Sequence, residues 1–192
     1  MEYFDILDEN GNKTGRVKER DAVHRDGDLH GGAHMWIARD LMPDGDFMVL
    51  LQRRSRDKDS FPGCLDISSA GHVDAGETFL SAAVRELKEE LGLSATDGQL
   101  HFLFRNRTKG TYQFHGKIFR NEEIHHVYLV DPTVSLKDLR FQKDEIEELV
   151  WQKASRVMAA LKAKDPAYCI EREEFERLAA YITEYGRDKY GL

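Results

Sequence analysis

The sequence has few of the residues that cross-link small folds or separate domains. It contains 2 cysteines and 4 prolines among 192 residues. Cys64 and Cys169 lie far apart and have no Cys or His partner at zinc-ligand spacing, so neither a disulfide framework nor a structural zinc site is indicated. The prolines mark no linker, and no internal repeat is present. A chain of this length is therefore predicted to form one domain that buries its core without cross-links.

Long apolar runs and an excess of positive charge are also missing. No run approaches the roughly 20 apolar residues of a membrane span, and the N-terminus does not resemble a signal peptide. The net charge is −7, from 28 basic and 35 acidic residues, which argues against binding to a nucleic acid polymer. We expect a cytoplasmic protein with no membrane partner. An anionic substrate would then require a metal ion or a local cluster of Arg and Lys.

The spacing of apolar residues predicts strands and helices in mixed order. An N-terminal hairpin is expected from strands at 2–7 and 14–17. The apolar runs 34–38 and 47–52 flank a Pro-Asp-Gly turn and are expected to pair in one sheet. The other predicted elements are a helix at 78–91, strands at 100–104, 111–114 and 125–129, a helical region at 143–161 interrupted by a strand at 149–151, and a helix at 172–185. This order predicts an α/β or α+β sandwich with a mixed sheet.

The helix predicted at 78–91 carries three carboxylates on one face. Glu86, Glu89 and Glu90 stand at positions i, i+3 and i+4, and Gly92 is a typical helix stop. Like charges at this spacing destabilise a helix by a few tenths of a kcal/mol per pair, a cost that a divalent cation would remove. Composition alone favours a simpler explanation, in which the carboxylates are solvated.

The residues around these carboxylates favour a metal-binding role over simple solvation. The pattern runs from Gly71 through Glu77 to the segment 85–93, Arg-Glu-Leu-Lys-Glu-Glu-Leu-Gly-Leu, and it resembles the complete Nudix box, with about eight fixed identities over 23 residues. The resemblance implies a Nudix α/β/α sandwich with a mixed sheet, an N-terminal hairpin extension and a C-terminal helix. The implied single domain has an N-terminal extension at 1–30, a core at 31–162 and a C-terminal helical segment at 163–192.

The resemblance also implies hydrolysis of a diphosphate linkage with Mg²⁺, or alternatively Mn²⁺. Carboxylate oxygens are the hard ligands that Mg²⁺ requires. The implied metal ligands are Glu86, Glu89, Glu90 and, from a later loop, Glu145. The implied catalytic residues are Glu86, as ligand or general base, Glu89, and Arg85, which would orient the carboxylates. The implied substrate-binding residues are Arg53, Arg54 and Lys58, with Gly71 allowing the backbone to approach a phosphate.

Segments outside the box resemble the Nudix branch that includes type I isopentenyl-diphosphate isomerase. They are 3–10, 20–30, 50–55 and 61–72. In that branch three histidines and two carboxylates hold a metal, and a cysteine takes part in proton transfer. His24, His30 and His72 match the histidines and Glu123 matches one carboxylate, whereas Asn121 and Ala70 replace the other carboxylate and the cysteine.

These departures, together with the intact box, favour hydrolysis over isomerisation. The expected substrate is a nucleoside diphosphate derivative or a prenyl diphosphate, and a homodimer is possible. The alternatives are the isomerase itself and a ligand-sensing Nudix domain without activity. The three histidines match a second metal site, but scattered histidines are more often ordinary packing residues.

Overall fold

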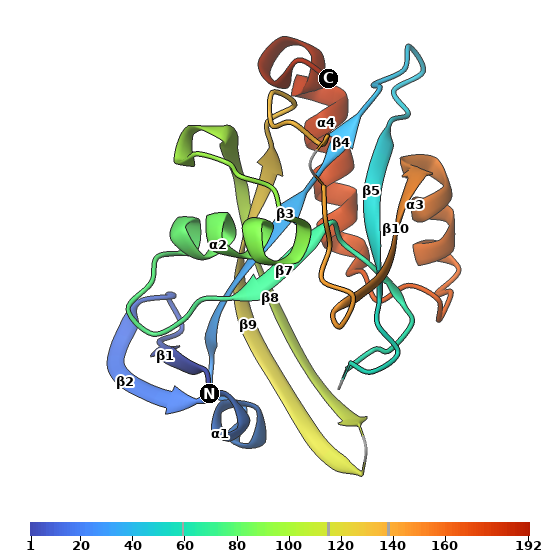
Figure 1. The fold of residues 1–192 in the computed structure, drawn as a ribbon. Helices are drawn as coiled ribbons and strands as arrows, with labels where there is room; N and C mark the ends of the chain where they lie inside the picture. The colour runs from blue at the N-terminus through green and yellow to red at the C-terminus, as the bar shows by residue number, and fades with distance from the viewer. Residues whose placement is uncertain (59, 115, 138) are drawn as a thin grey trace.

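The computed structural model of the chain describes residues 1–58, 60–114, 116–137 and 139–192. Its central sheet has the strand order β7-β3-β9-β8 (Figure 1). β3 and β9 run parallel, and the other two pairs are antiparallel, so the sheet is mixed. The four strands are β7 (Ser69–His72), β3 (His30–Trp36), β9 (Lys117–Val130) and β8 (Leu100–Phe114).

A second sheet and an N-terminal hairpin lie beside the central sheet. The second sheet has the order β10-β5-β4, and β6 also pairs with β5. Its strands are β4 (Ala38–Arg39), β5 (Met48–Arg54), β6 (Leu65–Asp66) and β10 (Ile146–Lys153). The hairpin consists of β1 (Tyr3–Leu7) and β2 (Lys13–Glu19), and α1 (Arg20–Asp26) follows it directly. The predicted N-terminal hairpin is confirmed.

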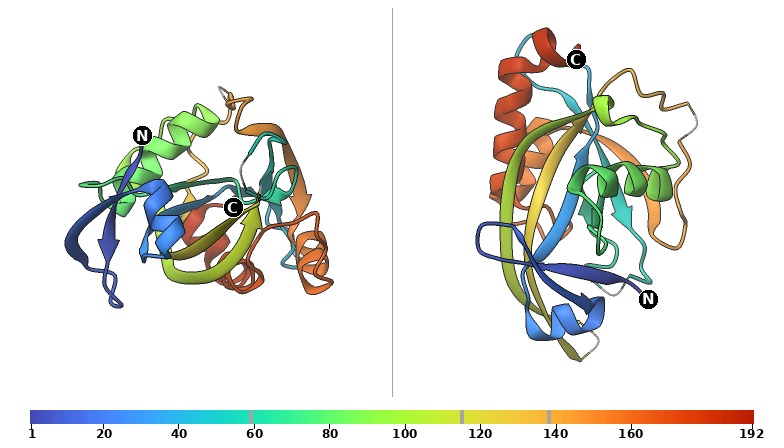
Figure 2. Two further views of the ribbon diagram at one scale, coloured as in Figure 1. Left: turned by 90° about the horizontal axis from the view of Figure 1, so that it is seen from below. Right: turned by 90° about the vertical axis from the view of Figure 1, so that its left-hand side faces the viewer.

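Helices cover both faces of the central sheet, as Figure 2 shows in its right-hand view. α2 (Phe79–Leu91) packs on one face, where Ala83, Leu87 and Leu91 are buried in an apolar core with β3 residues. α4 (Arg172–Tyr190) packs on the other face beside α3 (Ala154–Lys162), and both contribute to a second core. Besides α1 and these three helices, the only helical segment among the described residues is the short 3₁₀ turn η1 (Asp97–Gln99). The predicted α/β/α sandwich with a C-terminal helix is confirmed.

Both ends of α2 are fixed by capping residues that can be recognised in the sequence. Thr78 and Ser81 form a reciprocal capping box at the N-terminus. Gly92 ends the helix in the left-handed conformation, with φ of 68°, which a side chain would strain. The helix predicted at 78–91 is confirmed. None of the helices in the described ranges is long and apolar enough to cross a membrane.

Two expectations about strand partners and helix extent were wrong for most of their residues. The runs 34–38 and 47–52 share a sheet only at Ala38, because the chain turns at Ile37: residues 30–36 join the central sheet, and Ala38 and Arg39 pair with β5. Ile37 donates its backbone N–H to Ser68 Oγ at 2.9 Å instead of continuing a strand. The region 143–161 is not mainly helical, because β10 occupies residues 146–153, with the predicted strand 149–151 inside it. Cross-strand pairing with β5 determines that conformation.

Two smaller expectations were incomplete. The separate strands predicted at 100–104 and 111–114 are one continuous strand, β8. The helix predicted at 172–185 continues to Tyr190. Apolar periodicity located each element but not its full length.

Candidate active site

A cavity of about 510 Å³ lies where both sheets, α2 and the start of α4 meet. Its lining includes acidic residues of α2, histidines of the central sheet and basic residues near the end of β5. Most of the residues to which the sequence analysis gave a role line this cavity. They are Arg54, Lys58, Gly71, His72, Arg85, Glu86, Glu89, Glu90 and Glu145.

The carboxylate wall of the cavity is formed by Glu86, Glu89 and Glu90 of α2. The three side chains differ in exposure: Glu89 is 52% exposed, Glu86 is 15% exposed and Glu90 is buried. Glu90 accepts hydrogen bonds from Ser69 Oγ at 2.8 Å and from the Ala70 backbone N–H at 3.2 Å. Burial raises the pKa of Glu86 to about 7 and also raises the pKa of Glu90. A divalent cation would offset this penalty on the charged forms, so the wall fits a hard metal ion.

Arg85 connects two members of this wall, Glu86 and Glu89. Its guanidinium lies 2.7 Å from Glu86 and 3.1 Å from Glu89, and it pairs with Glu77 at 2.9 Å. It also donates to the backbone carbonyl of His72 at 3.0 Å. The ion pair with Glu77, together with those to the other carboxylates, raises the pKa of Arg85. Arg85 therefore fixes the loop before α2 to the carboxylates on α2.

Gly71 provides the space that Glu86 occupies. A Cβ atom at position 71 would lie 2.0 Å from Cδ of Glu86 and 2.2 Å from its Oε1. Real Cβ atoms do not approach other heavy atoms so closely, so any side chain at position 71 would displace the carboxylate. Gly71 was expected to let the backbone approach a phosphate, and in the structure the space beside its Cα holds the Glu86 carboxylate.

The three basic residues expected to bind substrate have different environments. Lys58 is ion-paired with Glu145, so both of these expected site residues lie together, and burial lowers the Lys58 pKa. Arg54 pairs with Asp66 at 3.0 Å and lines the cavity. Arg53 is not among the described residues that line the cavity. Its guanidinium pairs with the exposed Glu148 at 2.7 Å.

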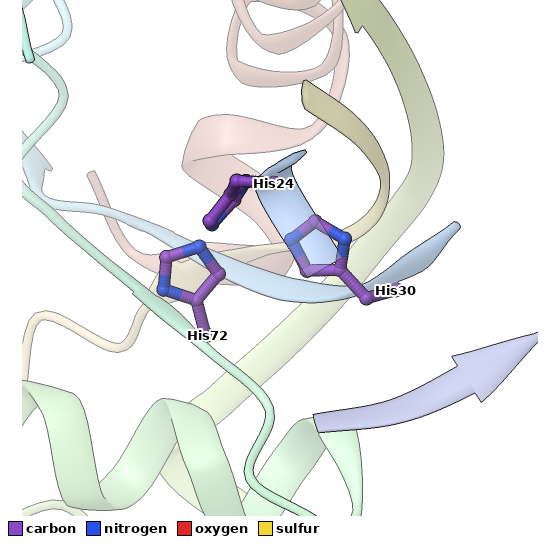
Figure 3. A group of neighbouring side chains, drawn as sticks. All are labelled: His24, His30 and His72. Atoms are coloured by element: carbon purple, nitrogen blue, oxygen red, sulfur yellow. The ribbon is translucent and has the colours of Figure 1, made fainter. Parts of the chain in front are cut away.

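His24, His30 and His72, the triple-histidine cluster, come together from α1, β3 and β7 (Figure 3). Their ring centroids lie between 4.9 and 5.5 Å apart. Phe4 of the N-terminal hairpin stacks on His72 at 4.6 Å and covers the cluster. Neither ring nitrogen of the buried His24 has a partner among the described residues, and burial lowers its pKa to about 3. A buried imidazole with free lone pairs is a typical metal ligand.

Glu123 of β9 brings a carboxylate to this cluster. Its Oε1 lies 3.1 Å from His30 Nε2 and 3.0 Å from His72 Nε2. Its Oε2 lies 2.6 Å from His125 Nε2. Burial raises the pKa of Glu123, but the histidines outweigh burial and hold the pKa well below its usual value. Three imidazoles and one carboxylate suit a transition metal such as Zn²⁺ or Mn²⁺ better than Mg²⁺.

A second histidine cluster was not identified in the sequence analysis. It consists of His34 on β3, His125 on β9 and Glu174 on α4. Glu174 is 140 positions from His34 in the chain. No local spacing connects these residues, and a glutamate in a charged helix resembles a solvated surface residue. Only the packing of α4 against the sheet reveals the contact.

The comparisons with known proteins agree with this geometry. The NUDIX domain family model matches residues 35–172. The chain is 41% identical over 169 residues to Nudix hydrolase 3 of Arabidopsis thaliana, covering 87% of this chain and 21% of the plant protein. It is 34% identical over 149 residues to an uncharacterised Nudix hydrolase of Clostridium acetobutylicum, covering 78% and 68%. The chain belongs to the Nudix hydrolase family.

A solved structure supports the fold. The chain resembles the crystal structure of DR0079 from Deinococcus radiodurans with a TM-score of 0.60 and 21% identity, over 92% of this chain and 98% of that one. The chain spans only about a fifth of the plant relative but more than two thirds of the bacterial one. At this level of identity the structural likeness concerns the fold alone.

Proposed function

We propose that this protein hydrolyses a diphosphate linkage in a small molecule and that the reaction depends on Mg²⁺, with Mn²⁺ as the alternative ion. The observation that carries the proposal is the carboxylate wall, in which Glu86, Glu89 and Glu90 face the cavity and Arg85 pairs with the first two. Surface acids do not need to be buried against Ser69 and Ala70 as Glu90 is. A metal-binding wall does need such fixed oxygen ligands.

The carboxylate wall would hold the metal through Glu86, Glu89 and Glu90, with Glu145 as a further ligand once it is released from Lys58. The chemistry supplied by bound Mg²⁺ is neutralisation of the diphosphate charge and activation of the attacking water. Glu86 has one of two roles, as a metal ligand or as the acceptor of the water's proton, and its pKa of about 7 in the metal-free protein suits the second role. Arg54 and the released Lys58 would bind phosphate oxygens.

The same cavity argues against isomerisation. Ala70 lines it at the position where the isomerase branch has its proton-transfer cysteine, and a methyl group exchanges no proton. The substrate is a nucleoside diphosphate derivative or a prenyl diphosphate. Phe61 and Tyr112, whose rings lie 5.1 Å apart at the cavity, provide an apolar surface for either a base or a prenyl tail.

The triple-histidine cluster is assigned a separate role. His24, His30, His72 and Glu123 would hold a transition-metal ion between the N-terminal hairpin and the central sheet. Because the cluster joins α1 to β3 and β7, this ion would stabilise the cavity wall. Metal analysis of the purified protein tests the assignment: His30→Asn is expected to lose one tightly bound ion per chain, whereas an unchanged metal content would refute it.

The reaction is tested by incubating the protein with nucleoside diphosphates, nucleotide sugars, dinucleotides and isopentenyl diphosphate, with and without Mg²⁺. We expect Mg²⁺-dependent release of phosphate, pyrophosphate or a nucleotide from one substrate class. Interconversion of prenyl diphosphate isomers without such release would instead identify an isomerase. Tight binding of a substrate without turnover would identify a sensor.

A further inference from the structure

His34 and Glu174 form an ion pair at the cavity, and neither residue belongs to the Nudix box or to the triple-histidine cluster. His34 Nδ1 lies 3.0 and 2.9 Å from the two carboxylate oxygens of Glu174. We propose that Glu174 holds His34 as a cation whose Nε2–H donates to a phosphate oxygen of the bound diphosphate. This inference rests on the proposed function, because it assumes that the ligand of the cavity is a diphosphate.

Glu174 is built into the core as a carboxylate anion. It is only 1% exposed. It accepts hydrogen bonds from Trp36 Nε1 at 3.0 Å and from Asn106 Nδ2 at 3.1 Å, in addition to its contact with His34. Burial raises the pKa of Glu174, but His34 and these donors outweigh burial and lower it to about 2. An ionised carboxylate in the core requires a cationic partner, and His34 is the partner within reach.

The orientation of His34 leaves one ring nitrogen for the cavity. Its Nδ1 faces Glu174, the side chain is 17% exposed, and the residue lines the cavity. The nitrogen available to a ligand is therefore Nε2. His34 lies directly opposite Ala70 in the antiparallel pair of β3 and β7, so both side chains point to the same face of the sheet. The small Ala70 side chain leaves room above the imidazole.

His34 and the carboxylate wall line the same cavity. Ala70, the residue opposite His34, donates its backbone N–H to Glu90 at 3.2 Å. A diphosphate that fills the cavity between the wall and His34 would have a positively charged donor on the side of His34. Charge-assisted hydrogen bonds of this kind are about twice as strong as neutral ones.

An ion pair explains these residues better than a metal ion shared with His125. The rings of His34 and His125 stack 3.8 Å apart with an interplanar angle of 23°, so their in-plane lone pairs do not converge on one point. His125 Nε2 is already 2.6 Å from Glu123, and both Glu174 oxygens accept hydrogen bonds.

The charges around His34 favour its protonated form. Burial lowers the His34 pKa, but Glu174 on α4, together with Glu123 on β9 and Asp66 on β6, outweighs burial and raises the pKa. His125 of β9 is the titratable base packed against it, and its own pKa is lowered by burial and by His34. The two pKa shifts run in opposite directions, which favours the proton on His34 rather than on His125.

The test measures binding without turnover. The probe is imidodiphosphate, a diphosphate analogue with a bridging N–H, titrated calorimetrically in saturating Mg²⁺. His34→Gln is expected to weaken binding by about tenfold, the effect of losing one hydrogen bond from a charged group. Glu174→Gln is expected to cause a similar loss. The matched control is His101→Gln, which breaks a histidine–carboxylate pair of 2.7 Å with Asp131 outside the cavity lining, and it should bind as the wild type does.

Two further readouts separate a specific effect from damage to the fold. The affinity ratio of wild type to His34→Gln should fall towards one as pH rises and His34 loses its proton. Nitrogen NMR should show both ring nitrogens of His34 protonated at neutral pH in the wild type. Wild-type affinity in His34→Gln, a neutral His34, or wild-type protein that binds no imidodiphosphate would each overturn the inference. Binding with the expected ratios but without hydrolysis of any substrate would overturn only the proposed function.

Discussion

The two sides of the cavity differ in how they are built. The carboxylate wall comes from five consecutive positions of one helix, so Glu86, Glu89 and Glu90 are neighbours in the sequence and in space. The histidine side, with His34, His72, His125 and Glu174, is assembled from β3, β7, β9 and α4, and its longest link joins residues 140 positions apart. A motif carried by one helix can be recognised from spacing alone, whereas a site assembled across a sheet depends on the topology. Substitutions on each side of the cavity test whether the two sides also differ in function.

The largest expected effect is on the carboxylate wall. Glu89→Gln should lower hydrolysis by about a thousandfold, because it removes a carboxylate ligand of the metal ion that would neutralise the diphosphate. Stability should hardly change, since Glu89 is 52% exposed. Steady-state kinetics and thermal unfolding check this, with Glu173→Gln on the exposed face of α4 as the control. Near-normal turnover in Glu89→Gln would remove the metal-ligand assignment.

A backbone change should disturb the same wall nearly as much. Gly71→Ala places a methyl group 2.0 Å from Cδ of Glu86, so the carboxylate must move. Displacing a catalytic group by about 1 Å can cost roughly a hundredfold in rate, and we expect a loss of that size in kcat. Gly98→Ala is the control, because a Cβ there meets no heavy atom within 4 Å. Equal activity of the two variants would show that the position of Glu86 is unimportant.

Two adjacent arginines allow a finer test of the cavity boundary. Arg54→Gln should raise KM by about tenfold, because Arg54 lines the cavity and would contact phosphate. Arg53→Gln should change KM by less than about twofold, because Arg53 pairs with the exposed Glu148 outside the cavity lining. Kinetic constants for both variants check the prediction. A larger effect at Arg53 would mean that the substrate extends beyond the described cavity.

The smallest expected effect is a pH dependence of the metal-free protein. The Glu86 pKa is about 7 in the folded state, against an ordinary value of 4.5. The folded protein therefore holds a proton that the unfolded chain releases between these values, so this group makes stability fall as pH rises from 4.5 to 7. Mg²⁺ affinity should rise over the upper part of the same window, by up to about tenfold per pH unit. Denaturant unfolding and calorimetric Mg²⁺ titration measure both trends, and a Mg²⁺ affinity independent of pH would contradict the Glu86 assignment.

The sequence predicted the fold class and the helix that carries the carboxylate wall, for physical reasons. The helix at 78–91 has its own cap, its own stop and a clear apolar stripe, so tertiary contacts only reinforce it. Within 143–153 only the strand at 149–151 was predicted correctly, because the charged and apolar positions around it fit a helix until pairing with β5 fixes a strand. The contact of His34 with Glu174 was beyond prediction, since it depends on where α4 lies against the sheet.

The triple-histidine cluster was predicted only in part from the sequence. Their match to the isomerase branch indicated that His24, His30 and His72 belong together, and the fold brings their ligand atoms within 4.8 Å of one another. Spacing alone could not give this result, because they come from three different elements. Gly32 shows the same dependence on the fold: a Cβ there would lie 2.5 Å from Cδ2 of His125, a contact that no sequence pattern reveals.

In the proposed reaction, water attacks a phosphorus atom of the substrate at the carboxylate wall. Running the reaction in water enriched in oxygen-18 tests this step directly. The substrate is the one identified in the panel, and mass spectrometry locates the label in the products, with and without Mg²⁺. The account predicts one labelled oxygen in a phosphate-containing product, dependent on Mg²⁺ and lost in Glu89→Gln. Unlabelled products, or label that appears equally without Mg²⁺ or in Glu89→Gln, would contradict it.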